Sequence, residues 1–178
     1  MPQIRRNFEN AGNAWVTGFL KSGATPNQGY AVLAQSVLFT ETTGAGVYTG
    51  SVVLPAGATL VDIIVSGIAL WTATTSAEMK VGDATDDDGY FTAVDLKATD
   101  LLATEEISLS AAGGQGGADV AGSQINRRYS ATARTISGIV TTVGAAGTAG
   151  RTLMTVLYVP ANTNDPHGVS MAGAAAKV

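Results

Sequence analysis

An apolar segment that alternates with a period of two constrains the fold of this chain most. We predict a strand over Thr59–Leu70, entered through a tight turn at Pro55-Ala56-Gly57. One face of this strand is wholly apolar and should be buried: Val61, Ile63, Val65, Gly67, Ala69 and then Trp71. The other face is mixed: Asp62, Ile64, Ser66, Ile68 and Leu70. The segment therefore predicts a central strand that is partly covered on both sides.

The rest of the chain repeats this pattern in short segments separated by glycine- and proline-rich turns. Further strands are predicted at Ala14–Lys21, Ser36–Glu41, Val47–Leu54, Glu78–Gly82, Tyr90–Val94, Glu105–Ser110, Ser130–Ile136, Gly138–Val143 and Arg151–Val159. Helical spacing is weak throughout, with short helical starts conceivable at Ala31–Gln35 and in Asp95–Ala103. This pattern predicts an all-β fold, a single β-sandwich or jelly-roll domain. We place the domain at 14–159, with extended N-terminal and C-terminal arms at 1–13 and 160–178.

Composition narrows the class of function. Charged residues make up 13% of the 178 residues, about half the usual share. Such a chain suits close-packed β-structure inside an assembly. The net charge of −4 gives no general attraction to nucleic acid. Without cysteine there is no disulfide or thiolate metal site, and we find no signal peptide and no segment able to span a membrane.

The only concentrated charge is the acidic turn formed by Asp83, Asp86, Asp87, Asp88 and Gly89. Hard cations such as calcium bind several carboxylate oxygens on a tight loop. The spacing is not that of an EF-hand, and no bidentate glutamate follows at the right distance. We therefore interpret it as a solvated turn, in which aspartates bond nearby backbone N–H groups. A calcium site is the alternative.

Other candidate catalytic residues fail on their context. His167 is the sole histidine and lies in the C-terminal arm, a poor platform for a catalytic triad. Adjacent Glu105 and Glu106 should point to opposite faces of a strand and cannot share a substrate. The glycine-rich segment Ala112–Gly117 lacks the residues of a phosphate-binding loop. We interpret Ala111–Ser123 as a long flexible loop unless a neighbouring chain holds it. We predict no catalytic, cofactor or metal site.

Aromatic and basic residues are candidates for contacts with other proteins. Trp71 should be in or near the core, whereas Trp15 could lie at a subunit contact or over a sugar. Arg5, Arg6 and Phe8 could dock the N-terminal arm on an acidic neighbour, or form a solvated chain end. The other arginine pair, Arg127-Arg128, reads as a solvated pair or a salt-bridge site.

Three segments together resemble a recurrent type of tailed-bacteriophage virion protein. They are VVLPAGATLVDIIV, VGDATDDDGYFTAVDL and RRYSATARTISGIVTTVGAAGTAGRTLMTVLYV, within residues 47–159. In that type a Leu-Pro-Ala-Gly turn joins two strands, an acidic V-G-D-x-x-D-x-D-G segment follows, and a Thr/Gly/Ala hairpin closes the chain. The resemblance implies a non-enzymatic structural protein of the virion, most similar to a capsid decoration or cement protein.

The resemblance also implies partners and a location. Such a protein, made in the host cytoplasm, would bind the outside of a phage head as a homotrimer and bridge major capsid subunits with its arms. A tail, neck or head-fibre base protein is the first alternative. A carbohydrate- or calcium-binding adhesion module, acting through Trp15 and the Asp83–Asp88 turn, is the second.

Overall fold

Eight strands and three short 3-10 turns make up the regular structure of the residues that the structure describes. The computed structural model describes residues 32–43, 46–120, 125–145 and 147–161. Its elements in chain order are β1 Leu33–Thr40, β2 Val47–Leu54, β3 Thr59–Ala69, β4 Ser76–Asp83, β5 Phe91–Asp95, β6 Glu106–Ser108, η1 Leu109–Ala111, η2 Gly113–Gln115, η3 Ala118–Val120, β7 Arg134–Val143 and β8 Arg151–Val159. Within these ranges the all-β prediction is confirmed.

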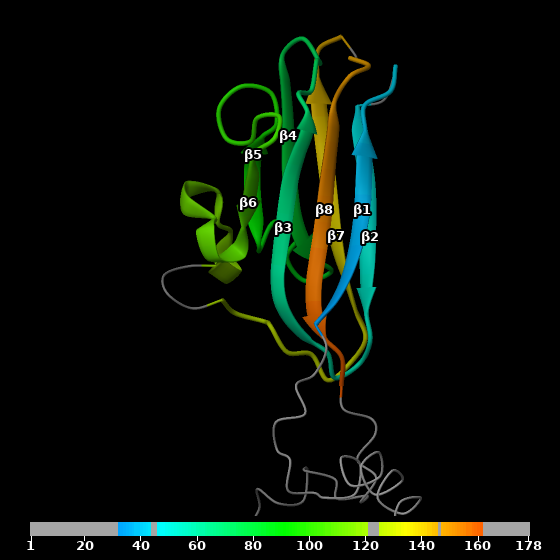
Figure 1. Cartoon of the computed structure of the whole chain (residues 1–178), viewed down its shortest axis with the longest axis vertical. Helices are drawn as coiled ribbons and strands as arrows, with labels where there is room; N and C mark the ends of the chain where they lie inside the picture. The colour runs from blue at the N-terminus through cyan, green and yellow to red at the C-terminus, as the bar shows by residue number, and fades with distance from the viewer. Residues whose placement is uncertain (1–31, 44–45, 121–124, 146, 162–178) are drawn as a thin grey trace, which may run out of the picture. The chain divides into compact units, whose positions relative to one another are not determined.

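The strands form two four-stranded antiparallel sheets that face each other (Figure 1). Sheet A has the order β1-β8-β3-β6, and sheet B has the order β2-β7-β4-β5. The chain folds as one long antiparallel hairpin that is wound into two sheets. Its successive strand pairs are β1–β8, β2–β7, β3–β6 and β4–β5. This is jelly-roll connectivity, and the sandwich prediction is confirmed.

Local sequence explains the β2–β3 connection. Pro55 accepts a hydrogen bond from the Ala58 N–H at 3.2 Å, and Gly57 has a φ of 75°. A positive φ at the third position of a tight turn is readily adopted by glycine. The Pro55-Ala56-Gly57 turn therefore carries the chain from sheet B to sheet A.

The core lies between the sheets, where alternate side chains of both inner faces meet. Ile63 and Val65 of β3 are fully buried, as predicted, but Val61 is only partly buried. A β-bulge between Leu60 and Asp62 shifts the alternation by one residue, so Leu60 takes the buried position instead. The prediction for Val61 was wrong because it assumed strict alternation along the strand, and the apolar pattern of the sequence does not reveal where a bulge interrupts that alternation.

Several strand boundaries also differ from the sequence prediction: β4 begins at Ser76, β6 ends at Ser108, and β7 begins at Arg134 instead of Ser130. β7 continues through Ser137, where we predicted a break between two strands. Gly138 lies within this strand. A Cβ at this position would lie 2.8 Å from Met79 Cε and Phe39 Cζ, so glycine is the residue that fits the core here. β1 begins at Leu33, and the helical start considered at Ala31–Gln35 was wrong because Leu33, Ala34 and Gln35 pair with β8; Ala31 lies outside the described residues.

The glycine-rich connection after β6 is ordered where the structure describes it. Its residues to Val120 form η1, η2 and η3, and Gly116 bridges to Phe91. The Gly117 N–H donates to the Tyr90 carbonyl at 3.1 Å. Prediction of a long flexible loop was wrong for Ala111–Val120, because its glycines permit close backbone packing against β5. Asp95–Ala103 forms a hydrogen-bonded turn without an α-helix.

Part of the prediction lies outside the described residues. The strand at Ala14–Lys21, the arm at 1–13, and residues 162–178 of the C-terminal arm fall there. In the described part no helix is both long and apolar enough to cross a membrane.

Candidate functional site

The aspartates of the acidic turn after β4 lie in two different environments. Asp83, at the end of β4, is buried and faces inward. Its carboxylate accepts hydrogen bonds from Arg127 Nη2 at 2.8 and 3.0 Å, and Arg134 Nη1 lies 3.8 Å away. Asp87 is exposed, and Asp86 and Asp88 are half-buried. The predicted cluster is therefore divided between a buried ion pair and a surface turn.

A network of buried polar groups surrounds Asp83. Arg134, at the start of β7, donates to the Tyr90 hydroxyl at 2.9 Å and to the backbone carbonyls of Arg127 and Arg128. Burial raises the pKa of the Tyr90 hydroxyl, although Arg134 acts against this. The network joins the end of β4, the start of β7 and the connection before it. Sequence analysis anticipated a salt bridge at Arg127 but missed Arg134.

Asp119, in η3, completes this network. Its carboxylate lies 3.7 Å from Arg127 Nε. Burial raises the pKa of Asp119 more than the arginine lowers it. Two acids and two arginines thus lie close together, which indicates a structural network that holds the glycine-rich connection against the sandwich.

The surface part of the turn is the only group of three or more possible metal-ligating side chains among the described residues. One carboxylate oxygen each from Asp86, Asp87 and Asp88 lies within 4.8 Å of the others. The Asp86 side chain and the nearby negative charges raise the pKa of Asp88. Lys80 forms an ion pair with Asp87 and already supplies a counter-charge. The three oxygens could hold a hard cation only in competition with this lysine.

We expect calcium to leave the stability of the protein unchanged. With Lys80 on Asp87 and Asp83 turned inward, adding about 1 mM calcium should shift the melting temperature by less than about 1 °C relative to chelator. Thermal unfolding of the wild type, Asp87→Asn and, as a control, exposed Glu106→Gln measures this. A calcium-dependent rise of several degrees that Asp87→Asn abolishes would instead show a metal site.

A second buried acid lies at the other end of the sandwich. Glu41, directly after β1, is 2% exposed. Its carboxylate accepts hydrogen bonds from the backbone N–H groups of Thr72, Ala73, Ala149 and Gly150 at 2.9–3.3 Å, and from the Thr72 hydroxyl at 2.8 Å. Burial by itself would raise the pKa of Glu41, but these hydrogen bonds outweigh it and lower the pKa. The carboxylate joins three connections and has no free face for chemistry.

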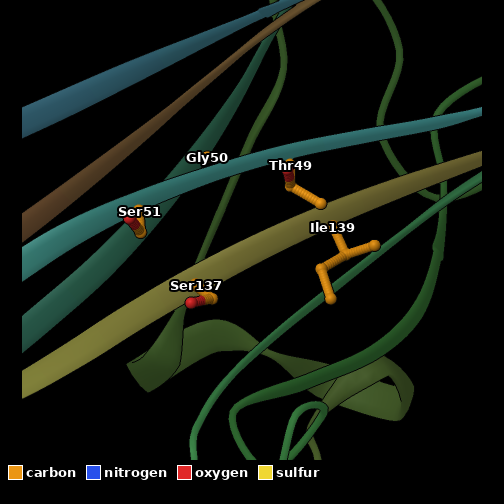
Figure 2. A pocket seen from close by; sticks show the side chains of 5 residues that line it. All are labelled: Thr49, Gly50, Ser51, Ser137 and Ile139. Carbon is orange, nitrogen blue, oxygen red and sulfur yellow. The ribbon is translucent and has the colours of Figure 1, made fainter.

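A shallow hollow lies on the outer face of sheet B, between β2 and β7 (Figure 2). It is lined by small or hydroxyl-bearing residues and one isoleucine: Thr49, Gly50, Ser51, Ser137 and Ile139. None of these is an acid or a base that could activate a hydroxyl group. The single histidine, His167, lies outside the described residues. The hollow therefore shows no catalytic arrangement.

The outer faces carry few charges near β1 and β2. Apart from the charged Asp62 and Arg151, the outer side chains on β1, β8 and β3 of sheet A are mostly small or apolar: Ala34, Ser36, Leu38, Leu153, Thr155, Leu157, Ile64 and Ser66. Sheet B presents a similar set across β2 and β7: Val47, Thr49, Ser51, Val53, Thr135, Ser137, Ile139 and Thr141. Such faces can approach another protein without the cost of desolvating charges.

The remaining predicted residues have structural positions. Trp71 is buried, as predicted, and its indole N–H donates to the Thr152 hydroxyl at 2.8 Å. Glu105 accepts a hydrogen bond from the Leu102 N–H at 2.9 Å, and Glu106 is exposed on β6. Outside the described residues lie Trp15, Arg5, Arg6 and Phe8.

Comparison with known proteins identifies similar folds. No family model matches the sequence, and no curated protein matches it. A chain in the acidic stable capsid structure of Helicobacter pylori bacteriophage KHP30 is similar, with a TM-score of 0.50 and 17% identity, over 73% of this chain and 89% of that chain. This likeness shows a shared fold.

Two further solved structures are similar at lower TM-scores. The cyanophage Pam1 capsid asymmetric unit matches with a TM-score of 0.43 and 23% identity, over 74% of this chain and 85% of that chain. The capsid of Ralstonia phage GP4 matches with a TM-score of 0.45 and 17% identity, over 79% of this chain and 92% of that chain. At these TM-scores neither adds to the argument.

Proposed function

We propose that this chain is a structural protein of a bacteriophage virion, and specifically a decoration protein on the outside of the head. The observation that carries the proposal is the shared fold with a chain from a phage capsid structure, over 73% of this chain and 89% of the other. The uncharged outer faces of β1, β2 and β7 support a role in an assembly. No catalytic role is part of the proposal.

The mechanism we propose is the bridging of major capsid subunits by a homotrimer with extended arms at 1–13 and 160–178. Leu33, at the start of β1, pairs with Tyr158, near the end of β8. The described chain therefore enters and leaves sheet A at the same end. This arrangement would let two arms act on one surface, and several weak contacts then combine through their effective concentration.

Arm deletion tests this mechanism. Removing residues 1–13 or 160–178 should weaken binding to phage heads that lack the protein by at least roughly tenfold, because each deletion removes one of the linked contacts. Co-sedimentation of purified protein with such heads measures the affinity, with Glu106→Gln as the exposed control. Undiminished binding of both deletion variants would contradict the clamp, and failure of the wild type to bind would contradict the decoration role.

The same sandwich could serve a tail, neck or head-fibre base. Localisation of the protein by density or by immunogold labelling on intact particles distinguishes these positions from the head surface. The adhesion alternative, through Trp15 and the Asp83–Asp88 turn, predicts a response to a glycan array or to calcium, and no response to either would exclude it.

A further inference from the structure

One side of the sandwich carries two strand edges and no charge. β1 and β2 lie at the ends of their sheets and beside each other (Figure 1). Among the described residues β1 pairs only with β8, and β2 pairs only with β7. Their sequences, LAQSVLFT and VYTGSVVL, contain no charged residue and no proline. We call β1 and β2 together the uncharged side.

Soluble proteins usually protect such edges. Lysine, proline, bulges or short strands prevent an edge from pairing with another chain. Here both strands are 8 residues long, and their pairing with β8 and β7 shows no register shift. None of these protective devices is present in either strand, so the uncharged side is suited to pairing with a further strand.

Apolar exposure is concentrated in the same place. Five of the nine exposed large apolar side chains among the described residues lie on these strands or directly before β1: Val32, Leu33, Leu38, Val47 and Val53. The charged side chains instead gather on β4, β5, β6 and their connections, where Lys80 and Asp87 are an example. Exposed apolar groups that gather beside open edges mark a contact surface.

We propose that β1 of one copy pairs, antiparallel, with β2 of a second copy. The two strands match in length and in their lack of charge, and their arrows point in opposite directions in Figure 1. Rotation about an axis parallel to the strands leaves these directions unchanged. When further copies are generated by rotation about such an axis, β1 of each copy lies next to β2 of its neighbour. Sheet A of one copy then continues into sheet B of the next. Every uncharged edge is covered when the ring closes.

This inference goes beyond the proposed function, because it concerns contacts between copies and does not require a phage head. A closed ring of three copies would agree with the homotrimer proposed above. A two-fold axis perpendicular to the sheets would instead pair β1 with β1 and β2 with β2 of a second copy, but that contact closes at two copies and cannot give the trimer proposed above, which is why we favour the β1–β2 contact.

Lysine substitutions on each edge test the contact. The full-length chain is measured by size-exclusion chromatography with light scattering over a range of concentrations. Leu38→Lys on β1 and Val53→Lys on β2 should each weaken self-association by at least roughly tenfold, because each lysine must be desolvated at the contact. Ile68→Lys is the matched control for Leu38→Lys, because both side chains are 45% exposed. Val143→Lys is the matched control for Val53→Lys, because Val143 is 51% exposed and Val53 is 58% exposed. Thermal unfolding verifies that all four variants fold.

Each outcome decides the proposal. A wild type of three copies, with loss of association in both edge variants and both controls associating like the wild type, supports the β1–β2 contact. A wild type that stops at two copies indicates β1–β1 and β2–β2 pairing and overturns it. Loss in Leu38→Lys alone indicates β1–β1 pairing and overturns it. A wild type that stays monomeric at high concentration, or equal loss in the controls, also overturns it. Binding to phage heads is a separate measurement, so the proposed function can fail while this contact stands.

Discussion

Replacing Glu41 with glutamine is expected to lower the free energy of unfolding by about 3 kcal/mol at pH 7. The buried carboxylate accepts five hydrogen bonds, four of them from backbone N–H groups on two different connections. An amide of the same shape has one oxygen, and its NH₂ group would face donors. At least one buried N–H group would therefore lose its acceptor. Chemical denaturation at pH 7 measures the loss.

The difference between the wild type and Glu41→Gln should depend on pH. The pKa of Glu41 is lowered from its ordinary value of 4.5 in the folded state, so the carboxylate stabilises the fold above the unfolded pKa. This contribution is lost as pH falls below about 4.5 and through the folded pKa. The exposed Glu106→Gln is the control and should change stability little. A gap between wild type and Glu41→Gln that stays constant from pH 7 to pH 3 would contradict the argument.

Replacing Arg134 with methionine is expected to cost about 3 kcal/mol of unfolding free energy. This change leaves Asp83 buried with one arginine fewer, and it removes the donor to the Tyr90 hydroxyl and to two backbone carbonyls. Methionine keeps the volume of the side-chain stem, so the measurement reports mainly on the lost polar contacts. Denaturant unfolding of Arg134→Met is compared with that of Arg151→Met, because Arg151 is exposed on β8.

A double-mutant cycle separates the ion pair from the other contacts of Arg134. Asp83→Asn, Arg134→Met and the double variant should show a coupling of about 1 kcal/mol or more if the two side chains stabilise each other. Additive effects would contradict a direct interaction across the 3.8 Å between Arg134 Nη1 and Asp83 Oδ2. A loss below about 1 kcal/mol in Arg134→Met alone would show that the network contributes little to stability.

The Asp83–Arg134 network and the hydrogen bonds of Glu41 stabilise opposite ends of the sandwich. Asp83 and Arg134 lie where β4 ends and β7 begins, whereas Glu41 joins the connections that follow β1, β3 and β7. Between them the core consists of apolar side chains, with Tyr48 packed edge-on against Trp71 at 5.0 Å between ring centroids. Polar interactions at the ends thus hold the connections, and the apolar core holds the sheets.

Local sequence patterns were enough to predict most of the described strands and much of the core. Alternation of apolar side chains predicts β2, β3 and β8, because the period of a strand is a local property of its backbone. The Pro55-Ala56-Gly57 turn is equally local, since one glycine supplies the positive φ that the turn requires. Burial of Trp71 followed from its place after an apolar face.

The strand order, the face on which Val61 lies and the role of the charged residues depend on contacts between distant parts of the chain. The strand order depends on pairing between distant segments, and a single bulge reverses the face on which a side chain lies. Asp83 and Arg127 are 44 residues apart, and Glu41 and Gly150 are 109 apart, so no local pattern could connect them. The sequence predicted a single acidic turn because Asp83 lies only three residues before Asp86. The fold divided it, because a buried carboxylate requires partners that only distant parts of the chain supply.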